Sequence, residues 1–547
     1  MQFPNPSARP YRLNYGSTAL LAAVLLACIA LGHEGRRVAQ LALLALPMLA
    51  WLVWPVRGAG VHHLRTAMVW AWAMAFVLDG LVRAYLLHTY QAAPEGALVL
   101  GSAANTNPRE SAEYLAMQWR DMAVWAALAV ACAVLLAWCA QRGARVLIPL
   151  SAVGSVRAYG RWTLALAGVL LVATLLAYAS KPWRRLHPLL FWPNWVQTLH
   201  TLRGQWGDQQ QARDRALQRA QAAAPTLTQA GPATVVLVIT DSINRDNLAL
   251  YGYGRPTTPR LLAQQAQLGN QMQVLRNAWS VDASTLPAMR SMFNFGQPES
   301  QDPLHLLALA RAAGYKVWWI SNHDDMAIEQ KHGRLADVVE MVNRTPGRAG
   351  TSLDSELLDC VQEALQDPTP RKLVVVHLMG AHPHYSLRFP DGANPFENNA
   401  DGVDADLLQV GRSAWVRKFR REYDAAVLYH DGIVAALLQM TRDTGTPQTY
   451  RAWMYLSDHG QEVGHDSDRT GHSPSTPSGY RIPAIIWRNQ PSADLAARPF
   501  RADWVAWTVA DLLNIQWAGN LPSRDVLQPG YQWQAPVLPV DIPSFLD

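Results

Sequence analysis

The hydrophobic residues divide this chain into two parts with different patterns. Up to about residue 180 the sequence contains long apolar stretches that are almost free of charged residues. Most of these stretches reach the roughly 20 residues that an α-helix needs to cross about 30 Å of hydrocarbon, so they predict an N-terminal α-helical transmembrane domain. The five stretches are Ser17–Gly32, Val38–Val56, Ala67–Leu87, Met122–Ala140 and Trp162–Ala179.

The positions of arginine residues predict how these helices are oriented. Arginines precede the first helix and occupy the segments between the second and third helices and between the fourth and fifth. The positive-inside rule assigns that side to the cytoplasm, although Arg36 and Arg37 lie on the opposite side. Five crossings from a cytoplasmic N-terminus place everything after Ala179 outside the cytoplasmic membrane.

After residue 232 short apolar runs alternate with helix-like segments. The runs are rich in β-branched and aliphatic residues, which is typical of strands buried on both faces of a sheet. Alternation of this kind predicts an α/β/α sandwich with a mainly parallel sheet. The predicted strands are Val235–Ile239, Val317–Ile320, Leu373–Leu378, Trp453–Leu456 and Ala484–Trp487, and the predicted helices include Pro303–Ala313 and Tyr423–Met440.

These patterns predict three parts of the chain. Residues 1–180 form the transmembrane domain, with a polar exported loop at residues 88–121. Residues 181–232 combine tryptophans with Leu, His and Arg and then become rich in Gln, Ala and Pro, so we expect interfacial helices and a linker. Residues 233–547 form the exported domain.

Composition narrows the functional classes. The chain has 547 residues, of which 50% are hydrophobic, and a formal net charge of +5. Much of the positive charge is Arg at the membrane boundaries, and no basic stripe interleaved with aromatic residues suggests binding to nucleic acid. Cys360 is the only thiol of the exported part, so that part cannot form an internal disulfide and depends on its own core.

Residues that can bind metal or move protons stand at or near the ends of predicted strands. They are Asp241, His382 and the neighbours Asp458 and His459. Because ligands in open α/β sheets bind beyond the carboxyl ends of the strands, we expect these side chains to meet in one site. Zinc accepts Asp oxygen and His nitrogen in a tetrahedral set, and a catalytic site leaves one position open. A strand-end Asp can instead cap the following helix, and spacing alone leaves that alternative open.

Small hydroxyl residues in the segment Ser280–Phe293 precede a helix that is predicted to begin near Pro287. A hydroxyl at a helix N-terminus faces free N–H groups and the positive end of the helix dipole, which suits a nucleophile that carries phosphate or ligates a cation. Thr285 is the candidate nucleophile and Ser284 is the alternative. An ordinary N-cap is the other interpretation of either residue.

Four motifs together resemble a known family. They are Thr240–Pro259 with its Tyr-Gly-Tyr stretch, Ser284-Thr-Leu-Pro287, Met379-Gly-Ala-His382 and Ser457-Asp-His-Gly-Gln-Glu462. This set is similar to that of the membrane phosphoethanolamine transferases of Gram-negative envelopes, which belong to the alkaline phosphatase and sulfatase superfamily. The resemblance implies a periplasmic catalytic domain of that α/β/α type, attached to the bacterial inner membrane by a multi-pass anchor.

The resemblance also implies roles for particular residues. Thr285 corresponds to the nucleophile that accepts phosphoethanolamine, and His382 and His472 correspond to substrate-side catalytic histidines. The implied Zn²⁺ ligands are Asp241, Thr285, Asp458 and His459. The implied contacts to the head group of the donor lipid are Thr106, Asn107 and Glu110.

The implied reaction is zinc-dependent transfer of phosphoethanolamine from phosphatidylethanolamine to a cell-envelope acceptor, through a covalent phosphothreonine-type intermediate. Thr285 would be activated by zinc, which also stabilises negative charge on phosphoryl oxygens. A histidine with a pKa near roughly 6.5 could protonate the leaving diacylglycerol oxygen and later deprotonate the acceptor. The acceptor stays open among lipopolysaccharide, lipid A and another surface glycan, and we expect a monomer.

Two departures from the family pattern bear on the acceptor and the metal. Asp241 stands where family members usually have Glu, so its loop must come closer to the metal. Cys360 alone cannot form the disulfides of the lipid A-modifying branch, which argues against lipid A as the acceptor.

Three alternatives stand beside this interpretation. A glycerophosphate transferase would share the superfamily and the Thr nucleophile. A sulfatase-like hydrolase is disfavoured, because Thr285 replaces the Cys or Ser that becomes formylglycine and Arg290 lies one residue late. The third alternative is a catalytically inactive envelope sensor.

Overall fold

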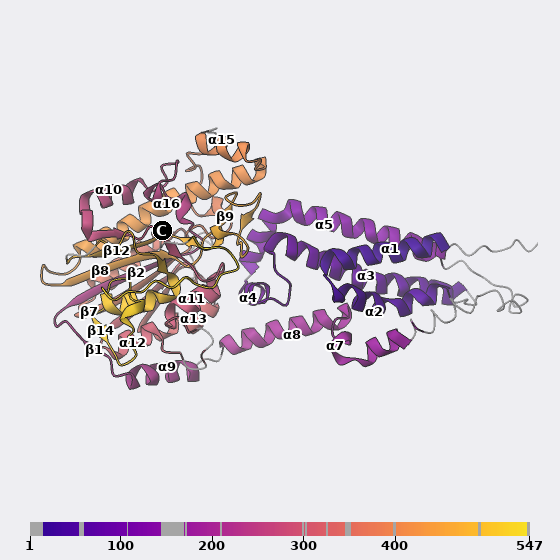
Figure 1. Ribbon diagram of the computed structural model, residues 1–547, viewed down its shortest axis with the longest axis horizontal. Coiled ribbons are helices and arrows are strands. Elements are labelled where there is room, and N and C mark those ends of the chain that lie inside the picture. Colours follow the sequence, from indigo (N-terminus) through magenta and orange to yellow (C-terminus); the bar gives the residue numbers. More distant parts are fainter. Residues whose placement is uncertain are drawn as a thin grey trace, which may run out of the picture. The chain divides into compact units, whose positions relative to one another are not determined.

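The computed structural model describes most of the chain in two compact units, which divide between Leu202 and Arg203 (Figure 1). The described residues are 15–53, 59–106, 108–143, 169, 172–207, 210–297, 300, 303–323, 326–344, 352–397, 401–490 and 494–543. Each unit has its own hydrophobic core, as expected of a domain.

Four helices of the first unit run side by side in Figure 1. They are α1 (Tyr15–Gly32), α2 (Arg36–Val53), α3 (Ala59–Tyr90) and α5 (Pro108–Gly143). Their buried aliphatic, Phe and Cys side chains form one cluster. Among the described residues, Gly60–Tyr90 and Glu110–Arg142 are long and apolar enough to cross a membrane by length and composition, and Gly16–Gly32 is a shorter apolar helix.

These helices match four of the five predicted apolar stretches, and the fifth is described only at residues 169 and 172–179, which are helical. Residues 88–121, predicted as a polar loop, are instead mostly helical, since α4 spans Ala97–Asn105 and α5 begins at Pro108. Polarity marks the end of an apolar stretch but not the end of a helix, because Arg, Glu and Gln are good helix formers.

Residues 181–232 are also largely helical. The helices are α7 (Lys181–Arg184), α8 (Pro188–Gly207) and α9 (Gln210–Ala222). α9 belongs to the second unit, because it packs against α12 (Leu306–Ala312) and because Arg213 Nε donates to the Arg334 carbonyl at 2.6 Å. The compact second unit therefore begins before residue 233.

The second unit is built on a seven-stranded sheet with the order β3-β12-β8-β2-β7-β5-β6 among the described residues. In that order the strands are β3 (Met272–Val274), β12 (Ala484–Arg488), β8 (Tyr450–Ser457), β2 (Ala233–Thr240), β7 (Arg371–Leu378), β5 (Lys316–Ser321) and β6 (Val338–Met341). β2 is parallel to β7 and β8, and β5 is parallel to β6 and β7. The mainly parallel sheet is confirmed, whereas the antiparallel direction of β12 was not predicted.

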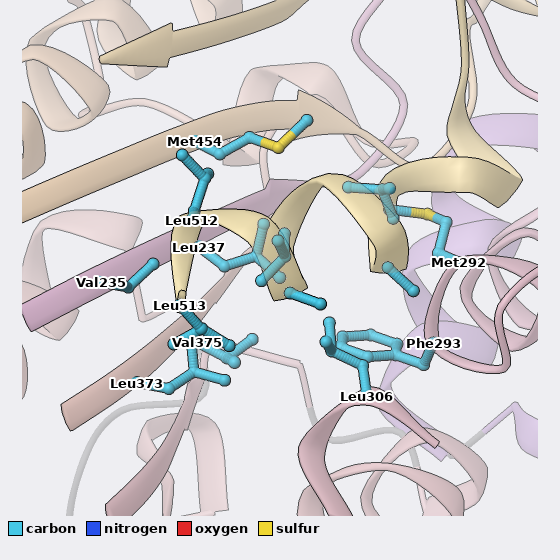
Figure 2. Packing of buried hydrophobic residues seen from close by; sticks show 14 of the residues in the cluster. Val235, Leu237, Met292, Phe293, Leu306, Leu373, Val375, Met454, Leu512 and Leu513 are labelled. Carbon is cyan, nitrogen blue, oxygen red and sulfur yellow. The ribbon is translucent and has the colours of Figure 1, made fainter. Parts of the chain in front are cut away.

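Helices cover both faces of this sheet. On one face Val235 and Leu237 of β2 and Val375 of β7 pack with Phe293 and Leu306 (Figure 2). The helices of this face are α11 (Thr285–Phe293), α12 and α17 (Val505–Leu512). The helices of the opposite face are α10 (Pro259–Leu268), α14 (Leu357–Gln366) and α16 (Ala414–Asp443). The predicted α/β/α layers are therefore present.

The register of the central strands aligns their carboxyl ends. Thr240, the last residue of β2, pairs with Leu378 at the end of β7 and with Ser457 at the end of β8. The residues that follow β2 and β8 are Asp241 and Asp458, so these two carboxylates emerge side by side at one edge of the sheet.

Candidate active site

Three potential metal ligands meet at the carboxyl edge of the sheet. A carboxylate oxygen of Asp241, a carboxylate oxygen of Asp458 and a ring nitrogen of His459 all lie within 4.8 Å of one another. His459 Nε2 lies 3.8 Å from Asp241 Oδ1 and 3.6 Å from Asp458 Oδ2. All three side chains are fully buried. The structure thus brings these residues from two strand ends into one group.

Thr285 is the first residue of α11, and its hydroxyl lies beside this group. Thr285 Oγ1 donates to Asp241 Oδ2 at 2.9 Å and lies 3.4 Å from His459 Nε2. Ser284 is the N-cap residue, but its side chain does not cap the helix and its Oγ donates to Asp282 Oδ1 at 2.8 Å. The hydroxyl of Thr285, and not that of Ser284, therefore lies beside the ligand group.

The donor set of this site fits a divalent metal ion. Asp458 Oδ2 is buried and has no hydrogen-bond partner within the described part of the chain. His459 Nδ1 lies 2.7 Å from the Gly460 carbonyl, which can only accept, so Nδ1 carries a proton and Nε2 is the nitrogen that offers a lone pair to a metal once it is deprotonated. Two carboxylates, one imidazole and one hydroxyl are ligands that Zn²⁺ accepts. The residues present are therefore compatible with zinc.

The two carboxyl groups of the site differ in their affinity for protons. Burial raises the pKa of Asp458 to about 7, and the neighbouring charge of Asp241 adds to this effect. Burial alone would also raise the pKa of Asp241, but the positive charges that His382, His459 and His323 carry when protonated at low pH outweigh burial and hold that pKa below its usual range. The carboxyl pair thus retains a proton near neutral pH, which a bound divalent cation would displace.

His382 and His472 also lie close to the ligand group. The ring centroid of His472 is 4.7 Å from that of His459, and His382 acts electrostatically on Asp241. The Nδ1 atoms of His382 and His472 are buried and lack a hydrogen-bond partner among the residues that the structure describes. Burial lowers the pKa of His382 to about 3 and that of His472 to about 4. Both rings are therefore neutral near pH 7, and they are weaker bases than the histidine with a pKa near roughly 6.5 that the proposed proton transfers call for.

Ser242 is a member of the site that sequence reasoning missed. Its Oγ donates to Asp241 Oδ1 at 2.5 Å, and its backbone N–H donates to Asp458 Oδ1 at 3.2 Å. A single serine after a strand is common and does not predict a functional residue. The only sequence signal for Ser242 is that it follows Asp241 directly. His377, by contrast, is a core residue whose Nδ1 lies 3.1 Å from Ser321 Oγ.

The turn that leads to His382 packs tightly against Asp241. The Ala381 N–H donates to the Asp241 carbonyl at 3.1 Å. Gly380 has a φ of 56°, and a Cβ atom there would lie 2.2 Å from Thr240 Oγ1 and 2.6 Å from the Asp241 carbonyl oxygen. Glycine is therefore required at this position by conformation and by space.

Gly380→Ala is expected to destabilise the second unit by about 3 kcal/mol or more and to weaken metal binding, because the new methyl group must displace the Asp241 backbone. Gly392→Ala is the matched control. Gly392 has a φ of 73°, but no atom lies within 4 Å of an added Cβ, so only backbone strain of about 1 kcal/mol is expected. Thermal unfolding and zinc titration of both variants check this prediction. Equal losses in the two variants would contradict it.

The residues implied in donor recognition lie in the first unit. Thr106 follows α4, and its Oγ1 donates to the Ser102 carbonyl at 2.7 Å. Glu110 is in the first turn of α5. Asn107 lies outside the described residues.

The second unit matches a known family. The Sulfatase family matches residues 233–515, which is just over half of the 547 residues. The chain belongs to the sulfatase family. Two strand-end Asp residues and the neighbouring His of this sulfatase domain form the ligand group described above.

Several relatives of this sulfatase domain are named phosphoethanolamine transferases. EptC of Escherichia coli K12 bears that name and is 29% identical over 321 residues, which cover 55% of this chain and 54% of EptC. The chain thus spans about half the length of such curated relatives. A crystal structure of the C-terminal periplasmic domain of Escherichia coli EptC in complex with Zn is 27% identical, has a TM-score of 0.51, and covers 57% of this chain and 90% of that chain.

The fold similarity extends to the first unit as well. The integral membrane protein lipooligosaccharide phosphoethanolamine transferase A of Neisseria meningitidis has a TM-score of 0.58, and the match covers 93% of this chain and 98% of that chain. The identity is 19%, so this similarity shows the fold alone.

Proposed function

We propose that this protein transfers phosphoethanolamine from phosphatidylethanolamine to an acceptor of the bacterial cell envelope, with Thr285 as the nucleophile. The observation that carries the proposal is the position of Thr285 Oγ1, 2.9 Å from Asp241 Oδ2 and 3.4 Å from His459 Nε2 at the start of α11. The name of EptC and the zinc complex of its periplasmic domain support the reaction and the metal.

Asp241, Asp458 and His459 would hold the zinc ion, with the Thr285 oxygen as the fourth ligand. When bound, zinc supplies positive charge that lowers the pKa of the hydroxyl and stabilises negative charge on phosphoryl oxygens. Asp241 accepts the Thr285 hydrogen bond and so orients the oxygen. The free N–H groups at the start of α11 favour an anionic phosphoryl group next to Thr285.

In the first step the Thr285 oxygen attacks the phosphorus of phosphatidylethanolamine. A bond forms between Thr285 Oγ1 and phosphorus, and the bond from phosphorus to the glycerol oxygen breaks. Diacylglycerol leaves after its oxygen takes up one proton, and Thr285 carries phosphoethanolamine. His382 and His472 lie beside the ligand group and are the candidates to take the threonine proton and return it to the leaving oxygen.

In the second step an acceptor hydroxyl attacks the same phosphorus. The bond from phosphorus to Thr285 Oγ1 breaks, a bond to the acceptor oxygen forms, and the acceptor proton returns to Thr285 through a histidine. Lipopolysaccharide or another envelope glycan supplies hydroxyl groups of this kind. Cys360 is the only cysteine of the second unit, which disfavours the disulfide-bearing branch that modifies lipid A.

The proposed location is the inner membrane, with residues 1–180 as a five-helix anchor, the segment that follows Ser180 at the interface, and the second compact unit, which includes α9, in the periplasm. The described apolar helices and the fold of the Neisseria integral membrane protein support this arrangement. Thr106, Asn107 and Glu110 would contact the donor head group. The membrane anchor would keep the catalytic domain where the donor lipid is concentrated.

The proposal is tested by the mass of the protein after incubation with donor lipid and no acceptor. We expect purified full-length protein in vesicles of phosphatidylethanolamine to gain the mass of one phosphoethanolamine group, located on the peptide that contains Thr285. A donor with a ¹³C-labelled ethanolamine head group must shift that mass. A glycerophosphate adduct from phosphatidylglycerol would identify the glycerophosphate transferase alternative, and the absence of any adduct and any diacylglycerol release would refute the proposal.

A further inference from the structure

A tyrosine hydroxyl contacts the backbone of the turn that carries Asp241, and Ser457 Oγ contacts the same turn by accepting from the Ile243 N–H at 2.9 Å. Tyr423 lies on α16, which covers one face of the sheet, and its side chain is fully buried. Its Oη donates to the Ser242 carbonyl at 2.7 Å and accepts from the Asn244 N–H at 2.8 Å. One hydroxyl therefore satisfies two backbone groups on either side of the turn that follows β2.

This turn has an uncommon backbone conformation. Ser242 has a φ of 62°, in the left-handed region that non-glycine residues rarely adopt. In this conformation its N–H points to Asp458 Oδ1 at 3.2 Å and its Oγ points to Asp241 Oδ1 at 2.5 Å. Ser242 thus contacts both carboxylates of the candidate metal site. A left-handed residue persists only where the surrounding structure holds it.

The contacts of Tyr423 supply such a restraint. The Ser242 carbonyl and the Asn244 N–H are buried, and both would be left unpaired if the hydroxyl were removed. The turn could then relax toward an ordinary conformation, in which the Ser242 N–H and Oγ no longer reach the carboxylates. Asp241 would then lose the hydrogen bond from Ser242 Oγ that restrains its carboxylate, although the Asp241 side chain itself would be unchanged.

The neighbour of Tyr423 on α16 holds the next part of the same loop. The fully buried carboxylate of Asp424 accepts from Asn247 Nδ2 at 2.8 Å, from Tyr253 Oη at 2.6 Å and from Arg255 Nη1 at 2.7 Å. Two consecutive residues of α16 therefore restrain the loop after β2, and of these two only Tyr423 acts directly on the metal-site turn.

We infer that Tyr423 is a positioning residue for the metal site, because its hydroxyl keeps Ser242 left-handed and so keeps Asp241 and Asp458 oriented for one shared cation. This inference deepens the proposed function and rests on it for the identity of the metal. Tyr423 does not touch the ligand atoms themselves. Loss of a group that hydrogen-bonds directly to metal ligands commonly changes metal affinity by about 10- to 100-fold, and Ser242, which Tyr423 restrains, is such a group.

The test is a zinc titration of the full-length protein in detergent, with Tyr423→Phe and Tyr315→Phe as a matched pair. Tyr315 is also buried, and its Oη donates to the Leu513 carbonyl at 2.6 Å in the hydrophobic core. Both substitutions remove one buried hydroxyl and keep the ring. We expect the zinc dissociation constant to rise about ten-fold or more in Tyr423→Phe and to stay unchanged in Tyr315→Phe.

A second readout separates positioning from general stability. The visible spectrum of the cobalt-substituted protein reports the geometry of the ligands and should change in Tyr423→Phe alone. Tyr423→Met, whose smaller and flexible side chain also lacks a hydroxyl, should weaken zinc binding in the same way.

Zinc affinity and a cobalt spectrum equal to those of the parent in Tyr423→Phe would overturn the inference, and so would equal losses in Tyr315→Phe. Because metal binding is measured without any lipid, failure of phosphoethanolamine transfer leaves this test intact.

Discussion

Thr285→Ala is expected to reduce phosphoethanolamine transfer at least about a thousand-fold, which is the scale of loss when a catalytic nucleophile is removed. The variant loses the oxygen that lies 2.9 Å from Asp241 Oδ2 and retains the rest of the ligand group. The loss of one hydrogen bond costs about 1 kcal/mol, so the protein should still fold. Release of diacylglycerol from phosphatidylethanolamine vesicles and the mass of the protein measure the effect.

Ser284→Ala is the control for this experiment. Ser284 is the neighbour of Thr285, but its hydroxyl donates to Asp282 and not to the ligand group. We expect Ser284→Ala to keep both transfer activity and the covalent adduct, and Thr285→Ser to keep part of the activity because it keeps a hydroxyl. The nucleophile would be Ser284 if the adduct survived in Thr285→Ala and vanished in Ser284→Ala.

Asp458→Asn is expected to lower zinc affinity by more than about 100-fold, since loss of a ligand should exceed the loss of a group that only supports one. An amide has nearly the shape of a carboxyl group but lacks its charge. The buried Asp458 Oδ2, which has no hydrogen-bond partner in the described part of the chain, is the atom that the substitution replaces. Transfer activity should fall with the bound zinc.

The pH dependence of zinc binding provides a second signature of Asp458. Burial raises the pKa of Asp458 to about 7 in the metal-free site. Zinc must displace that proton and also the proton of His459, whose pKa burial would lower but the carboxylates of Asp458 and Asp241 raise, so the affinity of the parent protein should rise with pH up to and beyond about 7. Asp458→Asn should remove the part of the rise in zinc affinity that is due to deprotonation of Asp458.

Asp431→Asn controls for the general effect of altering a buried carboxylate. Asp431 is buried and accepts from the backbone N–H groups of Arg260 and Leu261 at 2.8 and 3.0 Å, at the start of α10. This variant should lose thermal stability and bind zinc as tightly as the parent. A parent-like zinc affinity in Asp458→Asn would remove that residue from the ligand set.

Local patterns predicted most elements of the second unit but misplaced several boundaries. α16 begins at Ala414 instead of the predicted Tyr423, because Ser413 caps it by accepting from the Val416 N–H at 3.3 Å and the polar first turns still present a buried face. α9 falls within residues 181–232, predicted as interfacial helices and a linker, yet its contact with α12 makes it part of the second unit. Hydropathy measures only how polar a segment is. It does not show that a polar helix such as α9 can bury one of its sides against another helix.

The site was predictable to the extent that it follows strand ends. Asp241 and Asp458 each follow a continuous apolar run, which marks a buried strand and its carboxyl end. Ser242 and Tyr423 carried no such signal. Ser242 acts through a left-handed turn, and Tyr423 acts from a helix that is far from that turn in the sequence. Neither feature produces a hydrophobic pattern from which it could be predicted.

The sequence by itself determined which segments are apolar enough to form buried strands or long apolar helices, and which ligand-type residues stand at their ends. Those properties depend on residues close together in the chain. Only the tertiary structure decided that β2 lies between β7 and β8 in matching register, that β12 is reversed, and that Thr285 and not Ser284 faces Asp241 and His459. These choices depend on pairing and packing between segments far apart in the sequence, whose energies no local pattern records.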